Sequence, residues 1–105
     1  MHNSRALAFI SGLLLFAALA VAADLSGRVT VRGEPLAGAV VTANLIGQRG
    51  PAAVAVTRTG PRGEYTLRRL RNGDYIILVD LNGRRIYQGR IALTRPTLVK
   101  NVELK

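Results

Sequence analysis

The chain has 105 residues, enough for one small domain, and its 15 Lys and Arg against 6 Asp and Glu give a formal net charge of +9. It contains no cysteine, which excludes disulfides and excludes lipid attachment through a cysteine thiol. Its only histidine is His2, so nearly the whole chain lacks the commonest catalytic base and metal ligand.

Residues 1–23 have the pattern of a secretory signal peptide. Arg5 supplies the positive n-region, Ala6–Leu19 is predominantly apolar, and the small residues Ala20–Ala23 suit a signal peptidase. The alternative is an uncleaved membrane anchor, because the uncharged run is only slightly shorter than the roughly 20 residues of a spanning helix. Both interpretations place residues 24–105 outside the cytoplasm, in the periplasm or secreted, after an N-terminal signal helix.

Beyond residue 23 apolar and polar residues alternate, and Gly, Pro and Asn interrupt them at short intervals. This pattern is typical of a small all-β sandwich or barrel. The alternation predicts about seven strands: Leu25–Arg32, Ala39–Ile46, Ala53–Thr59, Glu64–Leu70, Asp74–Leu81, Arg84–Leu93 and Thr97–Leu104. In the first of them Leu25, Val29 and Val31 share one face with Gly27, as expected for a sheet that covers a core.

The turns between these strands are also readable. Asn82-Gly83 is the strongest hairpin signal, since a type I′ turn needs positive φ at both central positions. Gly47–Pro51 is expected to be a loose loop, and Gly89 is expected to mark a bulge. Further turns are predicted at Gly33–Pro35, Gly60–Gly63 and Asn72-Gly73.

Four segments follow one another in a recognisable order: Ser26–Val29, Glu34–Val41, Thr59–Leu67 and Leu70–Tyr75. Together they resemble the carboxypeptidase regulatory-like domain, a transthyretin-like (prealbumin-like) β-sandwich. The resemblance covers nearly all of residues 24–105 and implies an antiparallel Greek-key sandwich. Domains of this kind occur as accessory modules on peptidases, outer-membrane receptors and envelope proteins.

The signature residues have a structural interpretation. Gly38 lets the chain turn before Ala39 and Val41 enter the core, and Gly63 and Gly73 stand where tight turns need positive φ. Tyr65 and Tyr75 are placed to bury their rings and keep a hydroxyl at the end of the sheet. None of these residues indicates an activity.

The side chains available for catalysis argue against an enzyme. Relatives of this fold that hydrolyse hydroxyisourate use histidines and a Tyr-Arg-Gly-Ser tail, and intradiol dioxygenases hold iron with His and Tyr. This chain has no histidine after residue 2 and ends in Asn101–Lys105. The carboxylates fall mostly in or beside predicted turns, and Asp74, Asp80 and Asn82 lack the spacing of a calcium loop. We therefore predict no catalytic activity, no cofactor and no metal site.

Two surface features are candidates for binding. The first is a set of arginines expected on outer strand faces and beside the hairpin turn: Arg28, Arg32, Arg68, Arg84 and Arg85. If their strands are neighbours, they form a basic face for an anionic glycan, a lipid headgroup or another polyanion. The other interpretation is ordinary solvated arginine on strand faces.

The second feature is the apolar pair Ile76 and Leu78, which alternates with the core residues of its strand. Either a loop or second layer covers this pair, or it is a docking surface, because monomers rarely expose contiguous apolar patches. We expect a protein partner or self-association first, and anion binding as the alternative. Intracellular nucleic acid is not expected, and membrane contact is expected only if the N-terminal segment is retained.

Overall fold

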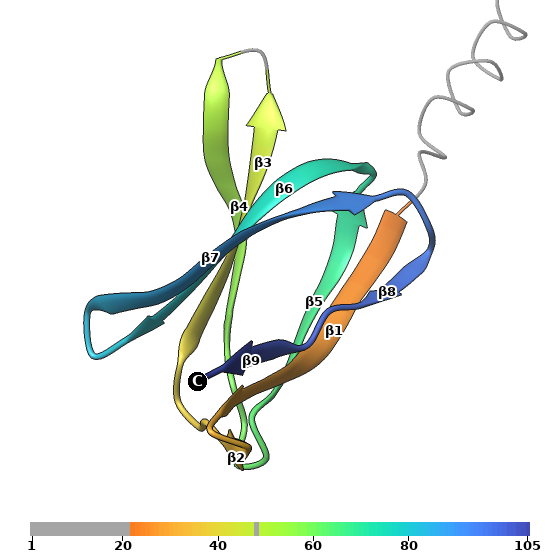
Figure 1. The fold of residues 1–105 in the computed structure, drawn as a ribbon. Helices are drawn as coiled ribbons and strands as arrows, with labels where there is room; N and C mark the ends of the chain where they lie inside the picture. Colours follow the sequence, from red (N-terminus) through yellow and green to blue (C-terminus); the bar gives the residue numbers. More distant parts are fainter. Residues whose placement is uncertain (1–21, 48) are drawn as a thin grey trace, which may run out of the picture.

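A computed structural model describes residues 22–47 and 49–105, which fold as two β-sheets packed into a sandwich (Figure 1). This confirms the all-β prediction. The described part contains nine strands: β1 (Ala22–Val31), β2 (Glu34–Pro35), β3 (Val40–Gly47), β4 (Gly50–Arg58), β5 (Glu64–Arg71), β6 (Gly73–Leu81), β7 (Arg84–Leu93), β8 (Thr97–Val99) and β9 (Val102–Leu104). Every one of the seven predicted strands is present. The differences are the short β2 and the division of the last strand into β8 and β9.

The expected signal helix falls on residues 1–21, outside the described residues. Ala22 and Ala23, at the end of the predicted signal peptide, open β1. Ala23 is 1% exposed and pairs with Leu70 of β5. No helix within residues 22–47 and 49–105 has the length and apolar character needed to cross a membrane.

The first sheet is built around β1. Strands β2 and β5 pair with it antiparallel, whereas β8 and β9 pair with it in parallel. The predicted sandwich is confirmed, and every pair outside the C-terminal segment is antiparallel as expected; β8 and β9 depart from that expectation. The chain leaves β7 in the other sheet, crosses over, and then runs beside β1 in the same direction (Figure 1).

Lys100 and Asn101 separate β8 from β9, and their polar groups explain why the predicted single strand is interrupted. The carbonyl of Lys100 accepts a hydrogen bond from the Tyr65 hydroxyl, and the side chain of Asn101 accepts one from the backbone N–H of Arg28. Both groups are used across the sheet, so β8 and β9 pair with different halves of β1.

The second sheet has the order β4-β3-β6-β7 and is antiparallel throughout. The expected loop at Gly47–Pro51 is much shorter than predicted, because β3 and β4 extend the ladder until Gly47 pairs with Gly50. The Asn82-Gly83 hairpin is confirmed, with φ values of 53° and 79°.

The bulge expected at Gly89 is wrong, because Gly89 pairs in register with Ile77. The register shift in β7 falls between Arg85 and Tyr87 instead. Gly89 has a different role: a Cβ there would collide with the hydroxyl of Tyr87, whose side chain lies against this glycine.

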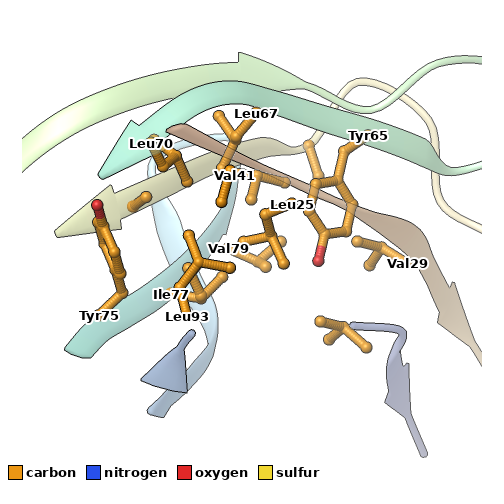
Figure 2. Close-up of a cluster of buried hydrophobic side chains, with 14 residues drawn as sticks. Leu25, Val29, Val41, Tyr65, Leu67, Leu70, Tyr75, Ile77, Val79 and Leu93 are labelled. Carbon is orange, nitrogen blue, oxygen red and sulfur yellow. The ribbon is translucent and has the colours of Figure 1, made fainter. Parts of the chain in front are cut away.

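The core lies between the sheets and is formed by the inward members of the alternating strands, shown in Figure 2. Its largest fully buried side chains are Tyr75, Leu25, Ile77, Leu93, Val29, Val41, Val79 and Val102. The predicted inward faces of β1, β5 and β6 are confirmed by their burial. The outward faces of both sheets and their open edge strands are consequently the surfaces available for binding.

Candidate binding surfaces

The outer face of the first sheet holds an open cleft of about 550 Å³. Its lining is polar and of mixed charge: Ser26, Gly27, Arg28, Thr30, Glu64, Tyr65, Thr66, Asn101 and Glu103. Arg28 stands directly opposite Glu64 in the ladder, so a carboxylate neighbours the first predicted arginine. This face is therefore less basic than the sequence suggested.

Glu64 is held in place by its own turn. Its carboxylate accepts a hydrogen bond from the Arg62 backbone N–H at 2.9 Å. Bonds from its own and the Arg62 backbone N–H lower the pKa of the Glu64 carboxyl below its ordinary value. An acid held ionised by structural hydrogen bonds is poorly suited to donate protons at neutral pH.

The polar cleft rests on Tyr65, which is buried at its base. The Tyr65 hydroxyl donates to the Lys100 carbonyl, and burial raises the pKa of Tyr65 to about 12. The phenol is therefore a neutral hydrogen-bond donor and a structural support. Across the two described stretches, no group of three or more His, Cys, Asp or Glu side chains could hold a metal ion.

The five predicted arginines do not share one surface. Arg28 and Arg68 lie on the exposed sides of neighbouring strands β1 and β5, and Arg32 lies in the β1–β2 turn with φ of 53°. Arg84 and Arg85 belong to β7 in the other sheet. The basic face was predicted on the condition that the strands carrying these arginines are neighbours. Strand β7 does not meet that condition, so Arg84 and Arg85 do not belong to such a face, and the role of the other three arginines stays a prediction.

Arg85 also has an acidic partner of its own. Its Nε lies 3.1 Å from the Asp80 carboxylate, on the adjacent strand of the β6–β7 hairpin. A second pair joins Arg90 and Asp74 at 3.4 Å. Both pairs are solvent-accessible and individually weak, but they reduce the positive charge of β7.

The structure reveals another arginine group that the strand alternation had hidden. A cleft of about 210 Å³ at the seam between β4 and β5 is lined by Val54, Ala55, Arg68, Arg69, Leu70, Arg71 and Tyr75. Arg69 has φ of 58° and lies at a bulge in β5, where Asp24 accepts a hydrogen bond from its backbone N–H at 3.0 Å. Strict alternation would turn Arg69 inward, and the bulge keeps it outside.

Arg68, Arg69 and Arg71 form no ion pair with a carboxylate among the described residues. The ion pairs found there involve only Arg85 and Arg90. The run Arg68-Arg69-Leu70-Arg71 in the sequence was the available signal for this group. Its significance depends on the bulge, which the sequence pattern did not predict.

The predicted docking pair lies on the outer face of the second sheet. Ile76 and Leu78 are half-buried, while Tyr75, Ile77 and Val79 of the same strand point into the core. In the ladder Leu78 lies between Thr42 and Gln88. No third layer of described residues covers this face (Figure 1).

The apolar surface continues across the sheet from this pair. Val56 of β4 faces Thr42 of β3, which in turn faces Leu78, and Val56 is 61% exposed. A shallow hollow of about 190 Å³ beside Ile76 and Leu78 is lined also by Asn44, Pro51, Arg85 and Gln88. The outer face of the second sheet thus has an apolar centre, formed by Ile76, Leu78 and Val56, and a polar rim. This is the usual composition of a protein-binding surface.

Comparisons with known proteins agree with this architecture. The sequence model of the carboxypeptidase regulatory-like domain matches residues 24–105. A comparison with curated proteins found no match. The chain is similar to the solved dioxygenase domain of a dioxygenase carbohydrate-binding protein fusion from the cellulolytic bacterium Streptomyces sp. SirexAA-E, with TM-score 0.56, 16% identity and 82% of each chain covered. At this identity the likeness establishes a shared fold alone.

Proposed function

The chain belongs to the carboxypeptidase regulatory-like domain family, and from this premise we propose that it is an exported, non-catalytic module that binds a partner protein, or a second copy of itself, in the cell envelope. The family is a regulatory domain type. The chain after residue 2 lacks histidine and cysteine, and its best-formed polar cleft contains a glutamate that is held ionised. These features favour a binding role over catalysis.

The observation that carries the proposal is the uncovered apolar face of the second sheet. Ile76 and Leu78 expose part of their side chains there, and Val56 extends the apolar area to the sheet edge. Burying such an area against a partner is favourable by about 25 cal/mol per Å² of apolar surface removed from water. Polar residues at the margin, such as Gln88, can hydrogen-bond to the partner and so fix its orientation, which apolar contact alone does not.

The test compares partner capture by the full chain with capture by an Ile76→Ser/Leu78→Ser double variant, after cross-linking in intact envelopes. Val99→Ser is the matched control, since Val99 is 62% exposed but lies on β8 of the first sheet. We expect a defined cross-linked species with the parent and the control, and its loss with the double variant. A monomer by light scattering, together with unchanged capture by the double variant, would contradict the proposal.

A second candidate function is binding of an anionic envelope component, which the net charge of +9 and the exposed arginines Arg28, Arg32 and Arg68 support. Such binding would weaken steeply with salt, because exposed charges are screened over about 8 Å at physiological ionic strength. Retention on heparin or anionic liposomes that is indifferent to salt would contradict it.

Export is part of the proposal and makes its own prediction about the cleavage point. Ala23 fills a core position against Leu70, so cleavage after Ala22 keeps this contact and cleavage after Ala23 removes it. We expect Ala23 to be the first residue of the mature protein. Intact-mass measurement of the envelope form tests this, and retention of Met1 would favour the membrane-anchor alternative.

A further inference from the structure

Strand β4 is the edge of the second sheet in the described part of the chain, where it pairs only with β3. The backbone N–H of Thr59, just after β4, donates to the Ala39 carbonyl at 2.8 Å. Since antiparallel pairing alternates, the N–H groups of Thr57 and Ala55 face β3, and those of Val56 and Arg58 face outward. Unpaired outward groups of this kind are a template for another strand.

The two edges of this sheet are protected to different degrees. Edge strand β7 carries Arg84, Arg85 and Arg90, and a register shift interrupts its ladder. Strand β4 has no charged residue before Arg58, and Val54 and Val56 are 50% and 61% exposed. Pro51 and a register shift at Val54 interrupt the hairpin half of β4. The open part of the edge is therefore Val54–Arg58, and its pairing with β3 is regular from Ala55 onward.

Beside this open segment lies the group of three arginines on β5. Arg68, Arg69 and Arg71 line the same cleft as Val54 and Ala55. None of the three has a carboxylate within ion-pair distance among the described residues. A strand added to β4 would thus place its side chains against Val56 on one face and near three unneutralised guanidinium groups on the other.

From this juxtaposition we propose that an extended acidic segment of a partner protein adds as a strand to the edge of β4 at Val54–Arg58. Its backbone pairs with the outward groups of β4, and its carboxylates contact Arg68, Arg69 and Arg71. The proposal rests on the proposed function in taking a protein as partner, but its site is the edge of β4 and the arginines of β5, which share Val56 with the apolar face and do not include Ile76 or Leu78.

Charge decides between the possible occupants. A second copy would bring another set of the same arginines to this seam in a chain of net charge +9, and like charges oppose that arrangement. A flexible polyanion would satisfy the arginines but offers no backbone N–H and C=O pattern for β4. An acidic extended peptide satisfies both features.

The experiment measures binding of a fluorescein-labelled synthetic peptide of alternating Glu and Val to the full chain by anisotropy. Its partner probe is the same peptide N-methylated at every residue, which keeps the charge and removes every backbone donor needed for strand pairing. We expect saturable binding of the first peptide and at least tenfold weaker binding of the second. Equal binding of the two peptides, or no binding of the first, would overturn the proposal.

Variants of the protein locate the site. Arg68→Glu/Arg71→Glu should weaken peptide binding by at least tenfold. The control Arg32→Glu/Arg84→Glu changes the net charge by the same amount but outside the β4–β5 seam. Its peptide affinity should therefore stay within about twofold of that of the parent. Equal losses in the two double variants would indicate non-specific attraction and overturn the proposal. Ile76→Ser/Leu78→Ser should leave peptide binding unchanged, so the failure of this proposal is distinguishable from failure of the proposed function.

The backbone requirement has its own variant. Val56→Pro removes one of the two outward N–H groups without removing a bond to β3, and it should reduce the difference between the plain and N-methylated peptides. The unfolding temperature of this variant shows whether the fold is kept. If Val56→Pro does not fold, the comparison of the two peptides on the parent protein still decides the proposal.

Discussion

The hydroxyl of Tyr65 donates a hydrogen bond to the backbone carbonyl of Lys100, with an O···O distance of 2.5 Å. Tyr65 is on β5 and Lys100 lies between β8 and β9, so the bond spans the first sheet from one side of β1 to the other. The ring lies beside Gly27 of β1, where no side chain intervenes. This arrangement explains why the sequence combines a glycine in the first strand with a tyrosine in the fifth.

Replacing Tyr65 with Phe should lower the free energy of unfolding by about 1–2 kcal/mol, because the ring remains and the Lys100 carbonyl loses its partner. Urea unfolding of the full chain measures this, and an unchanged denaturant slope shows that the native state keeps its compactness. Tyr87→Phe is the control, since no hydrogen bond of its hydroxyl is found among the described residues. Equal losses in both variants would contradict the role given to the Tyr65 bond.

Gly27→Ala should be more damaging than Tyr65→Phe. The added Cβ would collide with the backbone carbonyl of Lys100 and stand 3.0 Å from the Tyr65 ring. Overpacking against backbone costs about 3 kcal/mol or more when the neighbours cannot move. Gly47→Ala is the matched control, because its Cβ would meet only the Gly50 carbonyl oxygen at 3.9 Å.

Both glycine variants are compared by thermal unfolding under the same conditions. Gly47→Ala should unfold at the parental temperature within about 2 °C, whereas Gly27→Ala should unfold about 10 °C lower or remain unfolded. A Gly27→Ala protein with parental stability would show that β8 and β9 can move away from β1 without loss.

Alkaline pH should unfold the protein through Tyr65. Burial raises the pKa of Tyr65 from its ordinary value near 10 to about 12, so the folded state binds this proton more tightly than the unfolded state. The stability from the protonated phenol is complete below pH 10 and is lost as the pH rises from 10 towards 12. Burial also raises the pKa of Tyr75, so absorbance at 295 nm and circular dichroism, followed together, should show the Tyr65 and Tyr75 phenols ionising only as the fold is lost. Tyr65→Phe should remove one of these two delayed ionisations.

Thr59 fixes the crossing between the sheets and is the single buried polar residue identified in the described chain. Its hydroxyl donates to the Leu36 carbonyl at 2.7 Å and accepts from the Ala39 N–H at 2.9 Å. Thr59→Val keeps the shape and orphans both backbone groups, so it should cost about 2–3 kcal/mol.

The serine variant separates the hydroxyl from the methyl group. Thr59→Ser keeps both hydrogen bonds and should cost about 1 kcal/mol through the lost methyl contacts. Chemical denaturation of the two variants in parallel measures the difference. If Thr59→Val proves as stable as Thr59→Ser, water or another group must satisfy Leu36 and Ala39.

The strands could be predicted from the sequence because burial here is local. In β1 and β6, and in β5 as far as Leu67, each inward residue is separated from the next by one outward residue, so period-2 alternation gives the correct faces there. The Asn82-Gly83 hairpin was equally accessible, since its positive φ values are a property of the turn itself.

The parallel strands and the arginine seam could not be predicted in the same way. The interruption between β8 and β9 depends on Tyr65, which lies 35 positions earlier in the chain. The bulge that keeps Arg69 outside is stabilised by Asp24, 45 positions away. Such contacts are set by which strands become neighbours, and a pattern within one strand carries no information about them.

Acid should destabilise the protein in part through Glu64. Hydrogen bonds from its own backbone N–H and from the Arg62 N–H hold the pKa of this carboxyl below its ordinary value of 4.5. Because the folded-state pKa is the lower one, the stabilisation is present above pH 4.5 and is lost as the pH falls through the folded-state value. Glu64→Gln removes the charge and should unfold at a lower temperature than the parent at pH 7.

The test is how the difference in unfolding temperature between the parent and Glu64→Gln changes with pH. Thermal unfolding of the parent, Glu64→Gln and Glu34→Gln is measured between pH 3 and pH 7, with Glu34, an exposed glutamate on β2, as the control. The gap between the parent and Glu64→Gln should close in acid, because the parent carboxyl is then protonated and as neutral as the amide. A gap that persists unchanged at pH 3 would mean that the side-chain shape, and not the ionised carboxylate, stabilises the Gly60–Gly63 turn.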